Sequence, residues 1–378
     1  MFGKRRTYLD YAAGLAGNPS SPHEEGRQAK KVLEDARTTI ARLIEVQSDD
    51  VIFTSGATES NALAILGYVR SRRALTGLAS PGRNNMHVLY LPSAHASIVE
   101  NMKLLEAEGI TIEALPIKDY RVDTEVLAKM IRPETVLVAM EAVCGETGVV
   151  WNTREVADVL KKFRTAAVLH VDASQAPLTE KITRDHFGAD LLSFDASKVG
   201  PLHGCGVLIA HRTILMAPFY RGGGQERGLR PGTEAPELAR KFAVALRAAG
   251  DGRATFRATA ERDRARLISH ITSTIPNVSV HEGRSQAPQV LNLSFPGRDT
   301  DYLVALLDEA GFAVSTKSAC ETDSEEGSRA VFVLTGSAEE ARATLRISWG
   351  PRTRARDITR FAEALREAVT FIDSDTQR

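Results

Sequence analysis

Apolar residues recur along this chain with two different spacings. Between residues 29 and 44 they stand three or four positions apart, which predicts an amphipathic helix. After it, short apolar runs alternate with segments of helix length. The runs are VIFT at 51, HVLYL at 87, TIEALPI at 111, TVLVAM at 135, AVLHVD at 167, LLSFD at 191 and GVLIA at 206. This alternation predicts an α/β fold in which a mostly parallel sheet is covered by helices on both faces.

The pattern changes after residue 236. Residues 236 to 276 are almost entirely helical in pattern and predict a connecting pair of helices. Beyond them, VLNLSF at 290, DYLVALLDEAG at 301, AVSTKS at 313 and TLRISWG at 344 predict a smaller α+β unit that closes with a helix near the end of the chain. We therefore expect a large domain over residues 15–250 and a small C-terminal domain over residues 251–378, together with residues 1–14.

Composition narrows the classes of partner. The 378 residues include 48 Lys and Arg and 48 Asp and Glu, and no long block of one sign offers a footprint for nucleic acid or a membrane surface. No apolar run approaches the roughly 18 residues of a membrane span. The three cysteines, at positions 144, 205 and 320, are too few for a disulfide framework and suit a reducing cytoplasm. We expect a small-molecule or protein partner and no bound metal.

Polar residues follow several predicted strands, where open α/β sheets bind their ligands. TSGATESN opens a helix after VIFT, so backbone N–H groups near Ala57 and the hydroxyl of Thr58 suit a phosphate. HVDASQ brings Asp172 to a strand end, where a carboxylate suits a protonated ring nitrogen. A plain helix cap explains either motif taken alone. Lys198, 26 residues after Asp172, is either a Schiff-base nucleophile or a solvated loop lysine.

Three further candidates lie in the second half of the chain. The loop GGGQERGLRPGTE is too rich in glycine for a regular element, and its Arg230 and Thr233 suit a phosphate, across a subunit boundary if the protein is a dimer. Cys320, between small residues at the start of a polar segment, is the thiol that we expect to be exposed and reactive. Arg346 interrupts an otherwise apolar strand, as an arginine that binds a carboxylate does.

The order TSGATES, HVDASQ, SK, GGGQERGLRPGTE, SAC and LRISWG resembles that of the cysteine desulfurases of the NifS/IscS kind. These are fold-type I pyridoxal 5′-phosphate (PLP) enzymes of the class V aminotransferase family. The resemblance implies the PLP-transferase fold, with Lys198 as the lysine that binds PLP and Asp172 as the partner of the ring nitrogen. It also implies that Gln175 contacts the ring hydroxyl and that His95, in LPSAHAS, lies over the ring.

The same resemblance implies which residues contact the phosphate, the substrate carboxylate and the sulfur. Ala57, Thr58 and Ser197 would hold the phosphate, with Thr233 from a second subunit. Arg346 would bind the substrate carboxylate, and Cys320 would accept the sulfur.

The resemblance thus implies conversion of L-cysteine to L-alanine by a cytoplasmic homodimer, with a persulfide formed on Cys320. Lys198 would move the Cα proton, and His95 is a candidate to take the thiol proton of the substrate. An unidentified acceptor protein would take the sulfur, as in iron–sulfur cluster assembly. Two alternatives stay open: a PLP-dependent lyase of another sulfur or selenium amino acid, and a cofactor-poor scaffold that only relays sulfur.

Three features depart from the family pattern. Gly145 stands where the family has an Asn close to the ring oxygen, and the connection from YLDYAA to NPSSPH is short. The phosphate segment Ser-x-His-Lys reads Asp195-Ala196-Ser197-Lys198 here. An aspartate 4 Å from a phosphate costs on the order of 4 kcal/mol at an effective dielectric constant near 20. We therefore expect that Asp195 turns away, that a cation such as Arg230 compensates, or that cofactor affinity is reduced.

Overall fold

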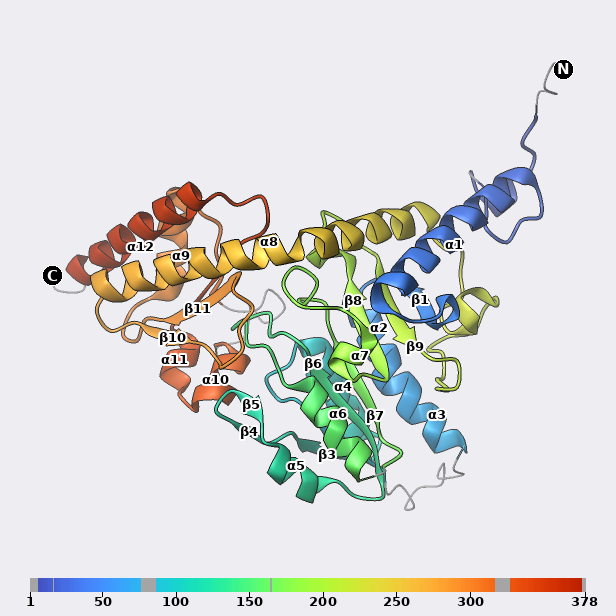
Figure 1. Cartoon of the computed structure of the whole chain (residues 1–378), viewed down its shortest axis with the longest axis horizontal. Helices are drawn as coiled ribbons and strands as arrows, with labels where there is room; N and C mark the ends of the chain where they lie inside the picture. Colours follow the sequence, from blue (N-terminus) through green and yellow to red (C-terminus); the bar gives the residue numbers. More distant parts are fainter. Residues whose placement is uncertain (1–5, 16, 76–85, 164, 317–326, 376–378) are drawn as a thin grey trace.

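The computed structural model describes residues 6–15, 17–75, 86–163, 165–316 and 327–375. The described chain forms a large and a small α/β unit that are joined by one long helix, α8 (Figure 1). Within these residues, no helix has both the length and the apolar character that crossing a bilayer requires.

The large unit is built on a seven-stranded sheet. Its strands lie in the order β1-β9-β8-β7-β6-β2-β3, and β2, β3, β6, β7 and β8 pair in parallel. Strand β9 runs antiparallel to both of its neighbours. The prediction of a mostly parallel sheet is therefore confirmed. The strands are β1 (Val51–Thr54), β2 (His87–Tyr90), β3 (Thr111–Ala114), β6 (Thr135–Glu141), β7 (Val168–Asp172), β8 (Leu191–Asp195) and β9 (Gly206–Ala210).

Helices flank this sheet, as its apolar strands require (Figure 1). The predicted helix at 29–44 is part of α1 (Glu24–Ile44), which packs along α8. A small hairpin, β4 (Ile117–Lys118) and β5 (Arg121–Val122), lies beside the sheet. The other helices of the large unit are α2 (Ala57–Ala62), α3 (Tyr68–Leu75), α4 (Ala96–Ala107), α5 (Thr124–Met130), α6 (Thr153–Lys162) and α7 (Arg184–Phe187).

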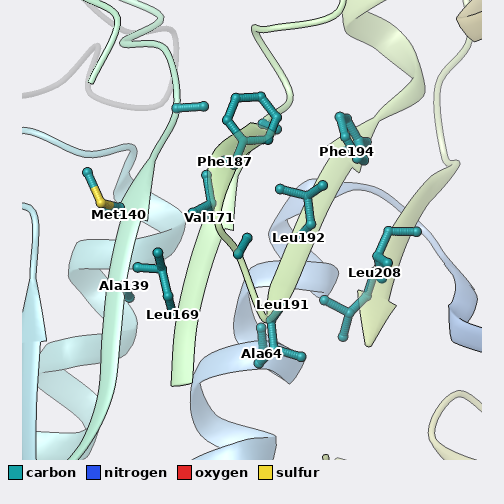
Figure 2. Close-up of a cluster of buried hydrophobic side chains, with 14 of the residues drawn as sticks. Ala64, Ala139, Met140, Leu169, Val171, Phe187, Leu191, Leu192, Phe194 and Leu208 are labelled. Carbon is teal, nitrogen blue, oxygen red and sulfur yellow. The ribbon is translucent and has the colours of Figure 1, made fainter. Parts of the chain in front are cut away.

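The central strands form the core of the large unit. Leu169 and Val171 of β7, Leu192 and Phe194 of β8 and Leu208 of β9 are essentially inaccessible to solvent (Figure 2). Strands covered on both faces bury every side chain, so their sequences are continuously apolar rather than alternating. Polar residues at the ends of these apolar strands are therefore candidates for a ligand-binding site at the edge of the core.

The small unit has its own core around a three-stranded antiparallel sheet. Strand β11 (Val290–Ser294) lies between β10 (Ser279–His281) and β12 (Thr344–Ser348). The helices are α9 (Thr300–Glu309), α10 (Arg329–Thr335), α11 (Ala338–Arg342) and α12 (Ala355–Asp375). The predicted α+β unit is confirmed, although the AVSTKS segment forms only an isolated bridge, between Ser315 and Arg346, within the described residues.

The predicted pair of connecting helices is wrong. Residues Pro236–Thr274 form the single helix α8, 39 residues long (Figure 1). Its first half packs Phe242 and Leu246 into the large core, and its second half packs Leu267 and Ile271 into the small core. No proline interrupts the helix after Pro236, and packing at both ends outweighs the cost of the two interior glycines. The expected domain boundary at 250/251 lies inside this helix.

Candidate active site

Three neighbouring parallel strands each end in a carboxylate. Glu141 ends β6, Asp172 ends β7 and Asp195 ends β8. Glu141 lies opposite Asp172 in the β6–β7 register. Because parallel strands finish at the same edge of a sheet, the three acids meet where an open α/β sheet binds its ligand.

A cavity of about 270 Å³ opens at this edge. Seven of the residues predicted from the sequence line it together. They are Ala57, Thr58, His95, Asp172, Gln175, Lys198 and Arg346. Ser197 and Thr233 do not line it: the Ser197 amide is turned to Asp195, and Thr233 is exposed beside Asn18. Cys320 lies outside the described residues.

Asp172 is held rigidly. The Asn61 side chain donates to Oδ2 at 2.6 Å, and the backbone N–H of Ser174 donates to Oδ1 at 2.9 Å. Both donors stabilise the carboxylate anion, and the residue is buried. These two hydrogen bonds fix the position of the Asp172 carboxyl group in the cavity lining, where it suits a cationic ring nitrogen.

His95 caps α4, and this fixes its tautomer. Its Nδ1 atom accepts the backbone N–H of Ser97 at 3.2 Å, and the Ser97 hydroxyl lies 2.8 Å from the same nitrogen. A nitrogen that accepts a backbone N–H carries no proton, so neutral His95 has its proton on Nε2. The ring can gain a second proton only at Nδ1, at the expense of the cap.

Lys198 and Arg346 bring the positive charge. Lys198 ends a short 3-10 helix, Ala196–Lys198, and makes no ion pair with any described residue. Arg346 comes from β12 of the small unit and donates from Nη1 to the carbonyl of Gly145, at 3.4 Å. Its neighbour in the β11–β12 register, Asn292, donates to the carbonyl of Glu146 at 3.2 Å. The small unit thus closes one side of the cavity.

Glu141 is a site residue that sequence reasoning missed. Burial, together with the charge of Asp172, raises the pKa of Glu141 well above its usual value. Its Oε2 accepts the His95 N–H at 3.3 Å, and its Oε1 is buried without a hydrogen-bond partner among the described residues. Burial raises the pKa of the adjoining Cys144 thiol as well. Two neighbouring carboxyl groups cannot both be ionised at low cost, which favours the protonated form of Glu141.

The departure at Gly145 has a local explanation. A Cβ on Gly145 would lie 3.0 Å from Nε2 of Gln175. The glutamine amide therefore fills space that an asparagine side chain at 145 would need.

Asp195 does not turn away from the expected phosphate position. Its Oδ2 accepts the backbone N–H of Ala57 at 2.9 Å, and its Oδ1 accepts that of Ser197 at 2.8 Å. Arg230 is not in contact with Asp195: its Nε lies 3.6 Å from Glu59, and no ion pair joins it to Asp195. Among the described residues, no cation lies within ion-pair distance of Asp195.

The two ends of the cavity fit PLP unequally. At the ring end, three buried polar atoms have no hydrogen-bond partner among the described residues: Ser93 Oγ, Ser174 Oγ and Glu141 Oε1. Buried polar atoms of this kind suit hydrogen bonds to a polar ligand. Asp172 and Lys198 suit the ring nitrogen and the aldehyde. At the other end, the chain's own carboxylate holds the N–H that a phosphate would take.

The sequence and the fold of this chain are both similar to those of known proteins. Residues 6–361 match the aminotransferase class V family. "Cysteine desulfurase IscS 1" of Archaeoglobus fulgidus is 30% identical over 358 residues, which cover 94% of this chain and 91% of the relative. A solved NifS-like protein superimposes with a TM-score of 0.85 at 25% identity and covers 94% and 92% of the two chains. SspA, solved in complex with cysteine, has a TM-score of 0.73 at 26% identity, with 89% and 92% covered.

Proposed function

This chain belongs to the class V aminotransferases and, within them, to the NifS/IscS-like cysteine desulfurases, and from that membership we propose how its own residues release sulfur from L-cysteine. The observation that carries the proposal is the convergence of Lys198, Asp172 and Arg346 on one cavity. A fixed acid, an amine and a guanidinium at that spacing suit a Schiff-base cofactor and an amino-acid carboxylate.

The ring end of the cavity holds the cofactor. Asp172 would bind the ring nitrogen, Gln175 would contact the ring hydroxyl, and Lys198 would bond the aldehyde. PLP, when bound, supplies the sink for the electrons of the substrate's Cα–H bond. Lys198 moves that proton, since it is the one amine that lines the cavity among the described residues.

The substrate end is formed by Arg346 and His95. Arg346 is proposed to bind the carboxylate of L-cysteine, because its guanidinium lines the same cavity as Lys198. His95 is proposed as the partner of the substrate sulfur. Because its Nδ1 is engaged by Ser97, neutral His95 presents Nε2–H as a hydrogen-bond donor, and the Nδ1 cap opens if the ring takes the thiol proton.

Cys320 is proposed as the sulfur acceptor. Its thiolate attacks the substrate sulfur, the Cβ–S bond breaks with its electron pair going to carbon, and that carbon takes a proton, which leaves alanine and a Cys320 persulfide. The other two thiols are poorly suited, because burial raises the pKa of Cys144 well above its usual value and that of Cys205 to about 12. A thiol that stays protonated is a weak nucleophile.

The remaining features of the proposal follow from the same chemistry. A persulfide is reversible cargo, so an acceptor protein takes the sulfur. A homodimer is proposed on the resemblance of the Thr233 loop, and a cytoplasmic location on the small number of cysteines.

The experiment is an assay of alanine and persulfide after L-cysteine is added to the chain reconstituted with PLP. Lys198→Ala should form neither product, and Cys320→Ala should bind the cofactor but form no persulfide. The control, Cys205→Ser, should behave as the wild type because that buried thiol lies off the cavity. Alanine formation by Lys198→Ala, or persulfide formation by Cys320→Ala at the wild-type rate, would overturn the assignment of that residue.

A further inference from the structure

The end of the cavity beside α2 is occupied by a side chain of the protein itself. Asp195 uses both carboxylate oxygens there, one on the Ala57 N–H and one on the Ser197 N–H. A Cβ built on Gly56 would lie 3.0 Å from Oδ2 of Asp195, so the carboxylate also packs closely over this turn. The backbone donor that opens α2 therefore already has an anionic acceptor.

The charges around this end do not favour a second anion. Besides Glu141, whose burial favours the neutral form, three carboxyl groups line the cavity, together with the amine of Lys198 and the guanidinium of Arg346. Lys198 is the residue that would bond the aldehyde, and Arg346 donates to the carbonyl of Gly145. Arg230 makes no ion pair with Asp195 among the described residues, and its Nε lies 3.6 Å from Glu59. A dianionic phosphate beside Asp195 would meet like charge with no described cation in contact.

The same end suits a neutral donor. A carboxylate oxygen has several lone pairs, so Asp195 can keep its two backbone N–H groups and still accept a hydroxyl. The ring end, in contrast, offers unsatisfied buried polar atoms on Ser93, Ser174 and Glu141. Binding energy at this site is therefore concentrated on the ring and the aldehyde rather than on the phosphate.

We propose that Asp195 makes this site accept pyridoxal, the phosphate-free form of the cofactor, at least as tightly as PLP. The 5′-hydroxymethyl group of pyridoxal donates to the Asp195 carboxylate, where PLP would place its phosphate. Asp195 is thus a specificity-determining residue, and the inference rests on the proposed bond between Lys198 and the aldehyde.

The test measures which form of the cofactor the full-length chain selects. The protein is stripped of cofactor, titrated separately with pyridoxal and PLP to obtain both dissociation constants, and then incubated with an equimolar mixture. Borohydride reduction fixes the bound aldehyde, and intact mass spectrometry distinguishes the two adducts by the mass of one phosphate. Asp195→Ser restores the hydroxyl of the family pattern, and Asp195→Asn removes only the charge.

The control is Asp190→Asn. Asp190 precedes the other end of β8 and also accepts a backbone N–H, that of Leu169 at 2.9 Å, but it does not line the cavity. The wild type and Asp190→Asn should bind pyridoxal at least as tightly as PLP. Asp195→Ser and Asp195→Asn should shift the preference toward PLP by about tenfold or more, which corresponds to roughly 1.4 kcal/mol.

Two results would overturn the inference. A wild-type preference for PLP of tenfold or more would show that Asp195 does not oppose the phosphate, and an unchanged preference in both Asp195 variants would show that it has no part in selection. In either case the proposed function stands, because an aldehyde is still bound. If neither aldehyde gives a reducible adduct on the wild type, the inference and the proposed function both fail.

Discussion

Replacing Glu141 by glutamine tests the buried carboxyl pair at the end of β6 and β7. Burial and the charge of Asp172 raise the pKa of Glu141 well above its usual value, so the folded protein keeps a proton there that the unfolded chain releases near pH 4.5. Above that pH the native state binds more protons than the unfolded state. The contribution of Glu141 to the free energy of unfolding therefore falls as the pH rises.

The magnitude follows from linkage. One proton retained in the native state changes the free energy of unfolding by about 1.4 kcal/mol per pH unit. Glutamine resembles the protonated carboxyl in shape but cannot ionise. Glu141→Gln should therefore gain stability over the wild type by roughly that amount for each unit between about pH 5.5 and 7, for as long as the native carboxyl keeps its proton.

The assay is urea unfolding of both proteins, followed by circular dichroism at half-unit steps across this range. Glu155→Gln is the control: Arg121 lowers the pKa of Glu155, so its carboxylate is ionised in both states over this range and the difference from wild type should be constant. A constant difference for Glu141→Gln as well would mean that the native carboxyl is ionised, and the account of the pair would be wrong.

Three further predictions concern other parts of the fold. Glu226→Ala should lose about 3 kcal/mol of unfolding free energy, since it removes the buried partner of the Arg37 guanidinium and leaves it only the more exposed Glu34, whereas Glu237→Ala, in an exposed pair, should lose less than about 1; equal losses in urea unfolding would refute this. Gly145→Asn should cost roughly 1 to 3 kcal/mol by crowding Gln175, and adding Gln175→Ala should restore most of it; a loss unaffected by the second change would point elsewhere. Burial lowers the pKa of His170 to about 4, so this residue by itself contributes a loss of up to about 1.4 kcal/mol of unfolding free energy per unit as the pH drops from 6.5 to 4, opposite in sign to the contribution of Glu141; His170→Asn should therefore gain stability relative to the wild type as the pH drops over this range, and a constant difference between the two proteins would exclude this role of the histidine.

The position of the site could be predicted because the end of a parallel strand is visible in the sequence. Asp172 closes AVLHVD, and Lys198 follows LLSFD within one βα unit, so the two share one edge of the sheet. Arg346 was identified as an arginine on an apolar strand, and the structure brings it to the same cavity from the small unit.

Glu141 is not among the residues predicted from the sequence, although it directly follows the apolar run TVLVAM, much as Asp172 ends AVLHVD. The signal was present, but the proximity of the two acids depends on the β6–β7 register, which the sequence does not specify. The orientation of the Asp195 side chain could not be predicted either, because it depends on which backbone N–H groups lie within hydrogen-bond distance in the folded chain. The sequence predicted two helices where α8 is one, because helical spacing alone does not distinguish one long helix from two consecutive helices.

Peptide mapping after borohydride reduction of the chain incubated with PLP tests the central claim most directly. The account predicts that the reduced cofactor is found on the peptide that contains Lys198, and that excess L-cysteine added before the borohydride removes most of it. Modification of a different lysine, or a Lys198 adduct that L-cysteine leaves unchanged, would contradict the claim that this cavity is where the substrate amine meets the cofactor.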